Sequence, residues 1–192
     1  MKQYWNYNPR GLIAGLFLFS KKVINKIHRI IFSKIHCANL GKVGKNIIIF
    51  PGFRYANPKT IILQNNIIIG KNVKFSNAEI PNGIINIENN VSIDFDSFID
   101  YSGSIIIRKN THIAWGVYIS THDHGYDYHN KPIGKPLEIC ENVFIGAKST
   151  ILHNCSRIGM NAVIGTCSVV TKDIPDNAIV AGNPAKIIKY RQ

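Results

Sequence analysis

The feature that most constrains the fold of this chain is a six-residue period of aliphatic side chains. The period runs from residue 87 to residue 170, with a slip of two after residue 99, an interruption after residue 119 and a slip of one after residue 151. Its members are Ile87, Ile93, Ile99, Ile107, Ile113, Ile119, Ile139, Ile145, Ile151, Ile158, Ile164 and Val170. An α-helix repeats about every 3.6 residues and a strand about every two, so neither element alone produces this period.

A second position in each six-residue unit is also restricted. Four residues after most of the aliphatic positions the side chain is small or β-branched, as at Val91, Ser97, Gly103, Thr111, Val117, Val143, Ser149, Cys155, Ala162 and Ser168. Such a unit forms one short strand and one turn, and three units close a triangular coil. The coils must stack into a solenoid to bury their apolar surface. A β-sandwich is the alternative, but its strands do not keep phase over ten units, so the sequence predicts an all-β solenoid.

Composition agrees with a β-rich body. The chain contains 35 Ile and 7 Leu, and β-branched side chains favour pleated strands, although codon bias in an AT-rich genome also raises the Ile count. With 192 residues, 45% of them hydrophobic and 18% charged, the chain has room for one domain and a short appendage, and it is not disordered. No apolar run approaches the roughly 20 residues that span a bilayer.

The formal net charge of +12 comes from the front of the chain. Residues 1–78 hold 13 Lys or Arg and no Asp or Glu, whereas residues 79–192 hold 10 basic and 11 acidic residues. The four cysteines form no CxxC pair and no zinc-like spacing. We therefore expect no metal site, and we expect reduced, buried thiols of a cytoplasmic protein at Cys37, Cys140, Cys155 and Cys167.

The first 40 residues form a separate basic and apolar segment. From Val23 to Ile35 the aliphatic residues follow helical spacing, with Lys26, Arg29 and Lys34 between them, which predicts a basic amphipathic helix. Two interpretations stay open. The helix packs on its own domain or on a neighbouring subunit, or residues 12–36 make peripheral contact with an anionic membrane at its inner face. Aromatic residues interleaved with the basic ones, as base stacking requires, are absent from this segment, so no nucleic acid is expected.

Four blocks near the carboxyl end carry a family resemblance. They are Ile139–Ala147, Ile158–Gly165, Val169–Pro175 and Ala181–Lys186. Together they resemble the hexapeptide-repeat acyltransferases, and most closely the maltose, galactoside, nodulation and surface-polysaccharide acetyltransferases. The resemblance runs from about residue 69 to the end and implies a left-handed parallel β-helix over residues 41–192. A helical segment (residues 1–40) would precede it, and a tail or short helix (residues 173–192) would end it.

A loop interrupts the six-residue period at residues 120–137 and contains three of the seven histidines. Acyl transfer to a hydroxyl needs a base, and imidazole has a suitable pKa near neutral pH. Alignment with the family without gaps places His124 at the catalytic position, whereas a two-residue shift would place His122 there; His129 is a remote third. The resemblance implies direct transfer, with a backbone N–H holding the oxyanion. Asp123 or Asp127 would orient the imidazole.

The resemblance also implies substrate-binding positions. Asp94 stands where the sugar acetyltransferases carry an asparagine, and Asp94 and Asp123 are the candidate acceptor-binding residues; a solvated corner is the alternative for Asp94. The acyl donor would be acetyl-CoA. Its candidate contacts are Gly146, Ala147, Gly165, Thr166, Thr171 and Lys172, with Lys186 and Lys189 at the nucleotide phosphates unless they are ordinary surface lysines.

These observations predict a homotrimeric, acetyl-CoA-dependent O-acetyltransferase with its active site between neighbouring prisms. The acceptor would be a sugar or glycan hydroxyl, in surface polysaccharide biosynthesis. The alternatives are a serine acetyltransferase, whose long helical domain is missing, a sugar N-acyltransferase, and a non-catalytic scaffold. A γ-class carbonic anhydrase is disfavoured because His153 matches its motif but a second ligand position holds Lys148.

Overall fold

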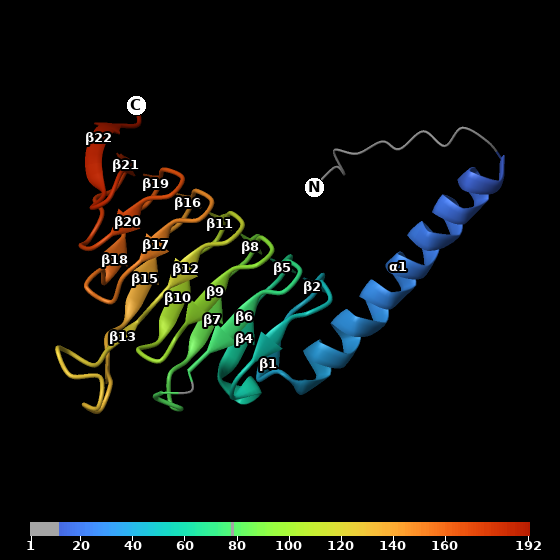
Figure 1. Cartoon of the computed structure of the whole chain (residues 1–192), viewed down its shortest axis with the longest axis horizontal. Helices are drawn as coiled ribbons and strands as arrows, with labels where there is room; N and C mark the ends of the chain where they lie inside the picture. Colours follow the sequence, from blue (N-terminus) through green and yellow to red (C-terminus); the bar gives the residue numbers. More distant parts are fainter. Residues whose placement is uncertain (1–11, 78) are drawn as a thin grey trace.

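A computed structural model describes residues 12–77 and 79–192 of the protein, with side chains placed from Leu18 onward. In this part of the chain a long helix leads into three parallel sheets that wind around one core (Figure 1). The helix α1 spans Leu12–Asn39. Residues 1–11 of the expected amino-terminal segment lie outside the described residues.

The three sheets form the faces of a prism. The first contains β1 (Lys42–Val43), β4 (Ile61–Leu63), β7 (Ile85–Ile87), β10 (Ile105–Ile107), β15 (Leu137–Ile139) and β18 (Arg157–Ile158). The second contains β2 (Ile48–Ile49), β5 (Ile68–Ile69), β8 (Ser92–Ile93), β11 (His112–Ile113), β16 (Phe144–Ile145), β19 (Val163–Ile164), β21 (Ala178–Ala181) and β22 (Lys186–Tyr190). The third contains β3 (Arg54–Tyr55), β6 (Lys74–Ser76), β9 (Phe98–Asp100), β12 (Tyr118–Ile119), β17 (Thr150–Ile151) and β20 (Val169–Val170). The predicted left-handed parallel β-helix is confirmed.

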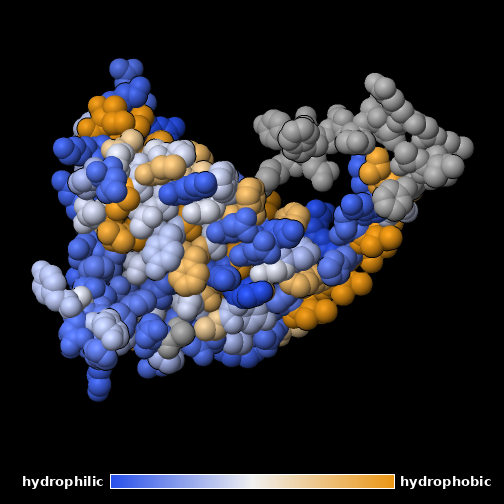
Figure 2. Space-filling view, viewed as in Figure 1, coloured by the Kyte–Doolittle hydropathy of each residue, from blue (hydrophilic) through white to orange (hydrophobic). Residues whose placement is uncertain are grey.

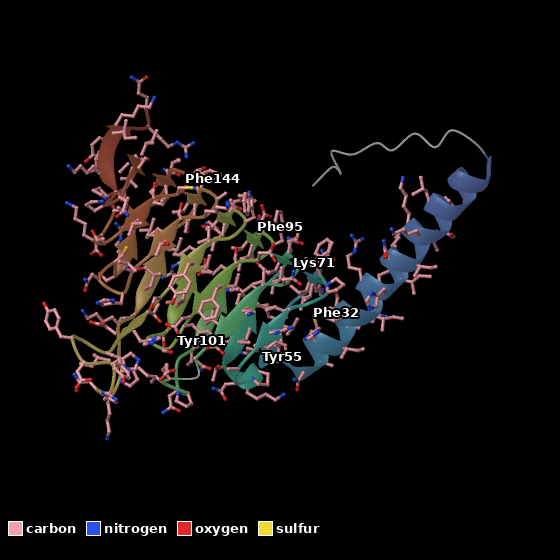
Figure 3. All side chains as sticks on the ribbon, viewed as in Figure 1. Phe32, Tyr55, Lys71, Phe95, Tyr101 and Phe144 are labelled. Atoms are coloured by element: carbon pink, nitrogen blue, oxygen red, sulfur yellow. The ribbon has the colours of Figure 1, made fainter. Side chains whose placement is uncertain are left out.

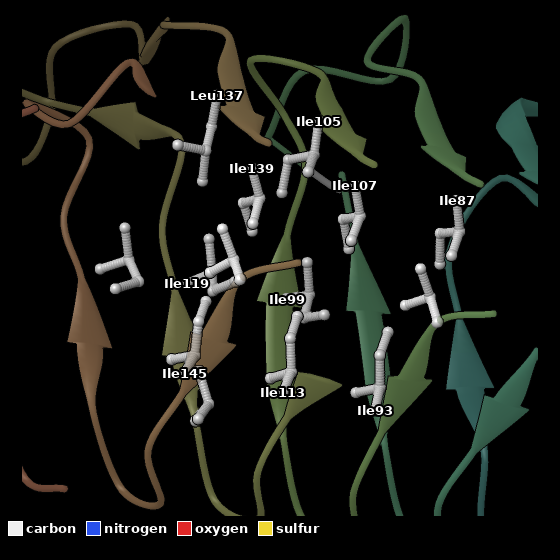
Figure 4. Close-up of a cluster of buried hydrophobic side chains, with 14 of the residues drawn as sticks. Ile87, Ile93, Ile99, Ile105, Ile107, Ile113, Ile119, Leu137, Ile139 and Ile145 are labelled. Carbon is white, nitrogen blue, oxygen red and sulfur yellow. The ribbon is translucent and has the colours of Figure 1, made fainter. Parts of the chain in front are cut away.

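The six-residue period corresponds to three columns of buried side chains (Figure 4). Ile87, Ile107, Ile139 and Ile158 are in register on the first sheet. Equivalent columns run through Ile93, Ile113, Ile145 and Ile164, and through Ile99, Ile119, Ile151 and Val170. All twelve side chains are 0% exposed. Because burying one such side chain contributes roughly 1.5–3 kcal/mol, the columns are the main source of stability.

One corner of the prism is built from a ladder of asparagines. Asn46, Asn66, Asn90, Asn110, Asn142, Asn161 and Asn177 all have φ between 58° and 61°. Each side-chain amide donates to the side-chain oxygen of the next asparagine, at 2.9–3.2 Å. Asparagine tolerates this left-handed conformation, which other residues with a Cβ disfavour. The ladder therefore turns the chain at every coil and ties consecutive coils together.

Substitution of Asn110 should separate these two contributions. We expect Asn110→Ala to lower the free energy of unfolding by about 2–4 kcal/mol, because it adds left-handed strain and removes two hydrogen bonds. Asn110→Gly removes the same bonds, but glycine adopts the left-handed conformation without strain. It should therefore lower the free energy of unfolding by roughly half as much. Urea denaturation of both variants measures the difference, and equal losses would show that backbone strain at this corner is negligible.

The two ends of the solenoid are covered. At the start, Phe32 and Cys37 of α1 pack against the core, and Ser33 Oγ donates to the carbonyl of Ile49 at 3.1 Å. Burial lowers the pKa of the His36 imidazole beside Tyr55. At the end, β22 pairs antiparallel with β21. The carboxyl-terminal part thus forms a hairpin, rather than the tail or short helix that the sequence suggested, and it covers the last edge of the second sheet.

The cysteines differ from the expectation in one case. Cys140 and Cys155 are buried, and burial raises the pKa of the Cys155 thiol to about 12, so it is inert at neutral pH. Cys37 is half-buried. Cys167 is exposed, because it occupies a corner position with φ of 58° that points away from the core, so the prediction of a buried thiol was wrong there.

Candidate functional site

The loop that interrupts the period leaves the prism at the corner after β12. Its two legs pair as a short antiparallel hairpin, β13 (His122–Asp123) and β14 (Ile133–Gly134). In Figure 1 this segment projects from the lower edge of the solenoid. The main-chain N–H of Lys135 donates to the carbonyl of Thr121 at 2.8 Å, which closes the base of the loop. The loop histidines are therefore held near a rigid corner.

His122 is held by a buried carboxylate that the sequence analysis missed. Asp100, at the end of β9, is 2% exposed, and its Oδ2 lies 2.8 Å from Nδ1 of His122. The same carboxylate accepts hydrogen bonds from the N–H of Thr121 (2.9 Å) and the hydroxyl of Ser102 (2.6 Å). A carboxylate in this position requires Nδ1 to carry the proton. Nε2 of His122 is then the nitrogen that can accept a proton.

His124 lies beside His122 but has a weaker partner. The two rings are 5.4 Å apart and nearly perpendicular. Nδ1 of His124 is 2.8 Å from the carbonyl oxygen of Asn130, which also leaves Nε2 as an acceptor. A neutral carbonyl stabilises an imidazolium less than an ionised carboxylate does. The structure therefore brings both candidate bases together and gives His122 the stronger support.

The two loop carboxylates expected to orient the base have other partners. Oδ2 of Asp123 is 3.2 Å from Nε2 of His153, which comes from the next coil. Asp127 contacts His129 at 2.9 Å, and hydrogen bonds from the His129 main chain and ring lower the pKa of Asp127. The carboxylate on His122 is thus Asp100, not Asp123 or Asp127, and His129 points to Asp127 instead of to the paired histidines.

Asp94 lies on a different corner, in a second cluster of polar and aromatic groups. Its side chain is 12% exposed and its Oδ2 is 3.4 Å from Nε2 of His112, whose Nδ1 contacts the hydroxyl of Ser92. Oδ1 is buried without a hydrogen-bond partner among the described residues. The His112 ring stacks on Phe144 at 5.5 Å. Asp94 is therefore buried rather than solvated, with one acceptor oxygen unused.

Exposed aromatic rings continue along this corner. Phe95 and Trp115 stack at 5.6 Å, and Nζ of Lys148 lies 4.8 Å from the centre of the Trp115 ring. Figure 3 shows Phe95 and Phe144 along one edge of the prism, away from Tyr101, which precedes Ser102 near the loop corner. Within one chain, Asp94 and the His122 loop occupy opposite edges of the third sheet.

The residues expected to bind acetyl-CoA also divide between these two edges. Gly146, Ala147, Gly165 and Thr166 lie in the turns after β16 and β19, on the same corner as Asp94. Thr171 follows β20 and lies on the corner of the His122 loop. The two glycines also have a packing role, because a Cβ on Gly146 would lie 2.7 Å from the carbonyl oxygen of Ile164, and one on Gly165 would lie 2.8 Å from Ala181 Cβ.

Lys172 and Lys186 meet at a pocket of about 300 Å³ between the last coil and β22. Its floor is apolar, with Ile174, Val180 and Ala185 among the lining residues. Asp173 lines the same pocket. Burial opposes its charge, but hydrogen bonds from Ser156 and Arg157 outweigh burial and lower the pKa of Asp173. Lys189 lies on exposed strand β22, outside the pocket lining. Two cations over an apolar floor suit a phosphate attached to an organic group.

Residues 12–77 and 79–192 lack two further features. No group of three or more His, Cys, Asp or Glu side chains is arranged to hold a metal ion there. In the same residues, no helix has the length and apolar character that crossing a bilayer requires.

Comparison with known proteins finds relatives and similar structures, but no family model matches. WbbJ of Escherichia coli K12, provisionally named an O-acetyl transferase of lipopolysaccharide biosynthesis, is 34% identical over 120 residues, 56% of this chain and 61% of WbbJ. The crystal structure of a maltose O-acetyltransferase from Clostridium difficile is 30% identical, with a TM-score of 0.57 over 83% of this chain and 74% of that chain.

A third match concerns the fold. AntD, an N-acyltransferase from Bacillus cereus in complex with dTDP and 3-hydroxybutyryl-CoA, has a TM-score of 0.73 at 22% identity, over 83% of this chain and 87% of AntD. Among the curated relatives named first, this chain spans between 45% and 61% of their length.

Proposed function

Because the chain belongs to the hexapeptide-repeat acyltransferase family, we propose that it transfers an acetyl group from acetyl-CoA to a hydroxyl of a sugar. The observation that supports this proposal most is the pair formed by buried Asp100 and His122 at the base of the loop. The pair presents an unprotonated imidazole nitrogen to solvent, which is what proton removal from an alcohol needs. We also propose a role in surface polysaccharide biosynthesis, because the relative WbbJ is named for lipopolysaccharide biosynthesis.

His122 and Asp100 can carry out the proton transfers that acetyl transfer requires. Nε2 of His122 takes the hydroxyl proton as the sugar oxygen bonds to the thioester carbonyl carbon. The tetrahedral intermediate then breaks its carbon–sulfur bond, and the imidazolium returns the proton to the departing CoA thiolate. Asp100 stabilises the transient imidazolium and fixes the ring. His124, whose ring lies 5.4 Å from that of His122, is proposed to contact a substrate, and no covalent acyl-enzyme is needed.

A panel of mono- and oligosaccharides with acetyl-CoA tests the proposed activity. Release of free CoA thiol is expected only when both acetyl-CoA and an acceptor with a free hydroxyl are present. Thiol release that requires serine would instead identify a serine acetyltransferase. Thiol release with an amino sugar whose hydroxyls are blocked would identify a sugar N-acyltransferase. A chain that binds acetyl-CoA but releases no thiol with any acceptor would be a scaffold.

Asp94 is proposed to bind the acceptor. Its side chain is 12% exposed and its buried Oδ1 has no hydrogen-bond partner among the described residues, so rotation of the carboxylate can present an acceptor oxygen to a sugar hydroxyl. We expect Asp94→Asn to raise the acceptor KM about tenfold or more while the acetyl-CoA KM stays within twofold, since a hydrogen bond to a charged group contributes about 1.5–3 kcal/mol. Steady-state kinetics with each substrate varied measures this. An unchanged acceptor KM would place the acceptor elsewhere.

Lys186 and Lys172 are proposed to contact the phosphates of the donor, with Lys189 nearby. We expect Lys186→Ala to raise the acetyl-CoA KM about two- to fivefold with little change in kcat, because an exposed ion pair contributes at most about 1 kcal/mol. Lys42→Ala, an exposed lysine on the first coil, is the matched control. Equal effects of the two substitutions would make Lys186 an ordinary surface residue.

The active protein is proposed to be a homotrimer, in the cytoplasm and at the inner face of the membrane. The division of Asp94 and the His122 loop between two edges supports assembly, since a neighbouring prism can bring the Asp94 edge of one subunit against the loop of the next. A mixture of His122→Ala and Asp94→Ala chains, each impaired on its own, should then regain activity when co-assembled. No recovery would place a complete site within one chain.

A further inference from the structure

The helix α1 is docked on the solenoid by its last three turns. Arg29 lies 5.4 Å from the centre of the Phe50 ring, Ser33 bonds to Ile49, and Nδ1 of His36 is 3.2 Å from the Tyr55 hydroxyl. By contrast, every residue from Phe19 to His28 is exposed. Figure 1 shows this part of α1 extending away from the coils. Among the described residues, the solenoid therefore gives no cover to the stretch from Phe19 to His28.

The side of α1 that faces away from the solenoid is largely apolar, with Ser20 and Lys34 as the polar residues within it. Seven large hydrophobic residues of α1 are 40–68% exposed: Phe19, Val23, Ile24, Ile27, Ile30, Ile31 and Ile35. At about 100° per residue they fall on one side of the helix, roughly opposite the face through Phe32 and His36 that docks on the solenoid. Figure 2 shows the apolar atoms along the edge of the helix that faces away from the solenoid. A flat surface can therefore reach this apolar face.

The borders of the apolar face are basic. On the same helical projection Lys21 lies on one side, and Lys22 and Lys26 lie on the other. The sequence has no Asp or Glu before Glu79, so no acidic side chain of this region neutralises these charges. A second α1 placed on this face would bring like charges together. Residues 79–192 hold 10 basic and 11 acidic residues, so the rest of a second copy offers little net negative charge either.

We infer that α1 lies along the surface of an anionic phospholipid bilayer, with its apolar face from Phe19 to Ile35 among the acyl chains. Lysine side chains at the borders reach the phosphate groups, as in other basic amphipathic helices. A groove of about 330 Å³ at the foot of α1, with Arg29 and Lys34 beside Ile30 and Ile47, adds cationic and apolar contacts next to the same face. The inference goes beyond acyl transfer, because no residue of the proposed active site lies on α1.

Flotation of the full chain with vesicles tests this inference. We expect binding to vesicles of phosphatidylcholine mixed with phosphatidylglycerol, weaker binding at high salt, and little binding to phosphatidylcholine alone. Ile24→Asn should reduce the partition coefficient about tenfold or more, because it removes one immersed aliphatic side chain. Ile188→Asn is the matched control: Ile24 is 63% and Ile188 is 64% exposed, and they lie at opposite ends of the protein. Lys21→Gln/Lys22→Gln/Lys26→Gln should abolish the preference for the anionic lipid.

Three results would overturn the inference. One is absence of binding to both vesicle types, and another is equal binding of the Ile24→Asn and Ile188→Asn variants. The third is a smaller molar mass of Ile24→Asn than of wild type in light scattering without lipid, which would show that a second copy covers the apolar face. None of these results affects thiol release from acetyl-CoA, so failure of the membrane inference and failure of the proposed activity are distinguishable.

Discussion

Replacement of His122 by alanine should lower kcat for acetyl transfer about 100- to 10,000-fold, the range that a positioned general base contributes. The reason is geometric: Asp100 holds Nδ1, so Nε2 is the atom left to remove the hydroxyl proton. The substitution should lower the free energy of unfolding by about 1–3 kcal/mol without unfolding the protein, because buried Asp100 loses one partner but keeps its bonds to Thr121 and Ser102. Rates from thiol release and stability from urea denaturation are measured on the same preparation.

His124→Ala is the matched comparison, since both histidines lie on the same hairpin with their rings 5.4 Å apart. We expect a loss of less than about tenfold from this variant, through weaker substrate contacts. A large loss in His124→Ala with none in His122→Ala would reverse the assignment and support the register of the gapless alignment. Losses in neither variant would remove histidine base catalysis altogether.

Substitution of Asp100 by asparagine should lower kcat about 10- to 100-fold, with the KM of both substrates within about twofold. Asp100 is 2% exposed and is proposed to act through His122, by fixing its ring and stabilising its protonated form, so its loss should act on the chemical step. An amide can donate to Nδ1 and thereby reverse the tautomer. The ¹⁵N chemical shifts of the His122 ring should therefore change in this variant, which a purely structural role would not produce.

Asp127→Asn is the control for Asp100. Both substitutions change an aspartate that contacts a loop histidine into asparagine, but Asp127 is 60% exposed and pairs with His129. We expect its kcat and the His122 ¹⁵N shifts to match wild type. If Asp100→Asn behaved like this control, the short contact between Asp100 and His122 would have no role in catalysis.

Sequence alone predicted the solenoid because every coil repeats the same environment. Ile93, Ile113 and Ile145 are far apart in the chain, yet each must fill the same column, so the period is visible without knowledge of the coils' contacts. The asparagines of the corner ladder share this property and could have been found by the same count. The carboxyl-terminal hairpin could not, since β22 departs from the period and pairs antiparallel.

The candidate site was predictable only in part. The loop histidines were visible because the loop breaks the period, whereas Asp100 lies 22 positions before His122 and meets it only when the coils stack. Asp94 and His112 meet in the same way, from neighbouring strands of one sheet. The spacing of α1 predicted its basic amphipathic character, but not which face the solenoid covers, because that depends on where Phe32 docks.

Product analysis of the saccharide panel tests the central proposal most directly. Wild-type protein with acetyl-CoA should yield a singly acetylated sugar whose acetyl group mild alkali removes, as expected of an ester, and His122→Ala should yield none. An alkali-resistant acetyl group would identify an amide and an amine acceptor. Equal ester formation by wild type and His122→Ala would contradict the assignment of the Asp100–His122 pair as the site of proton transfer.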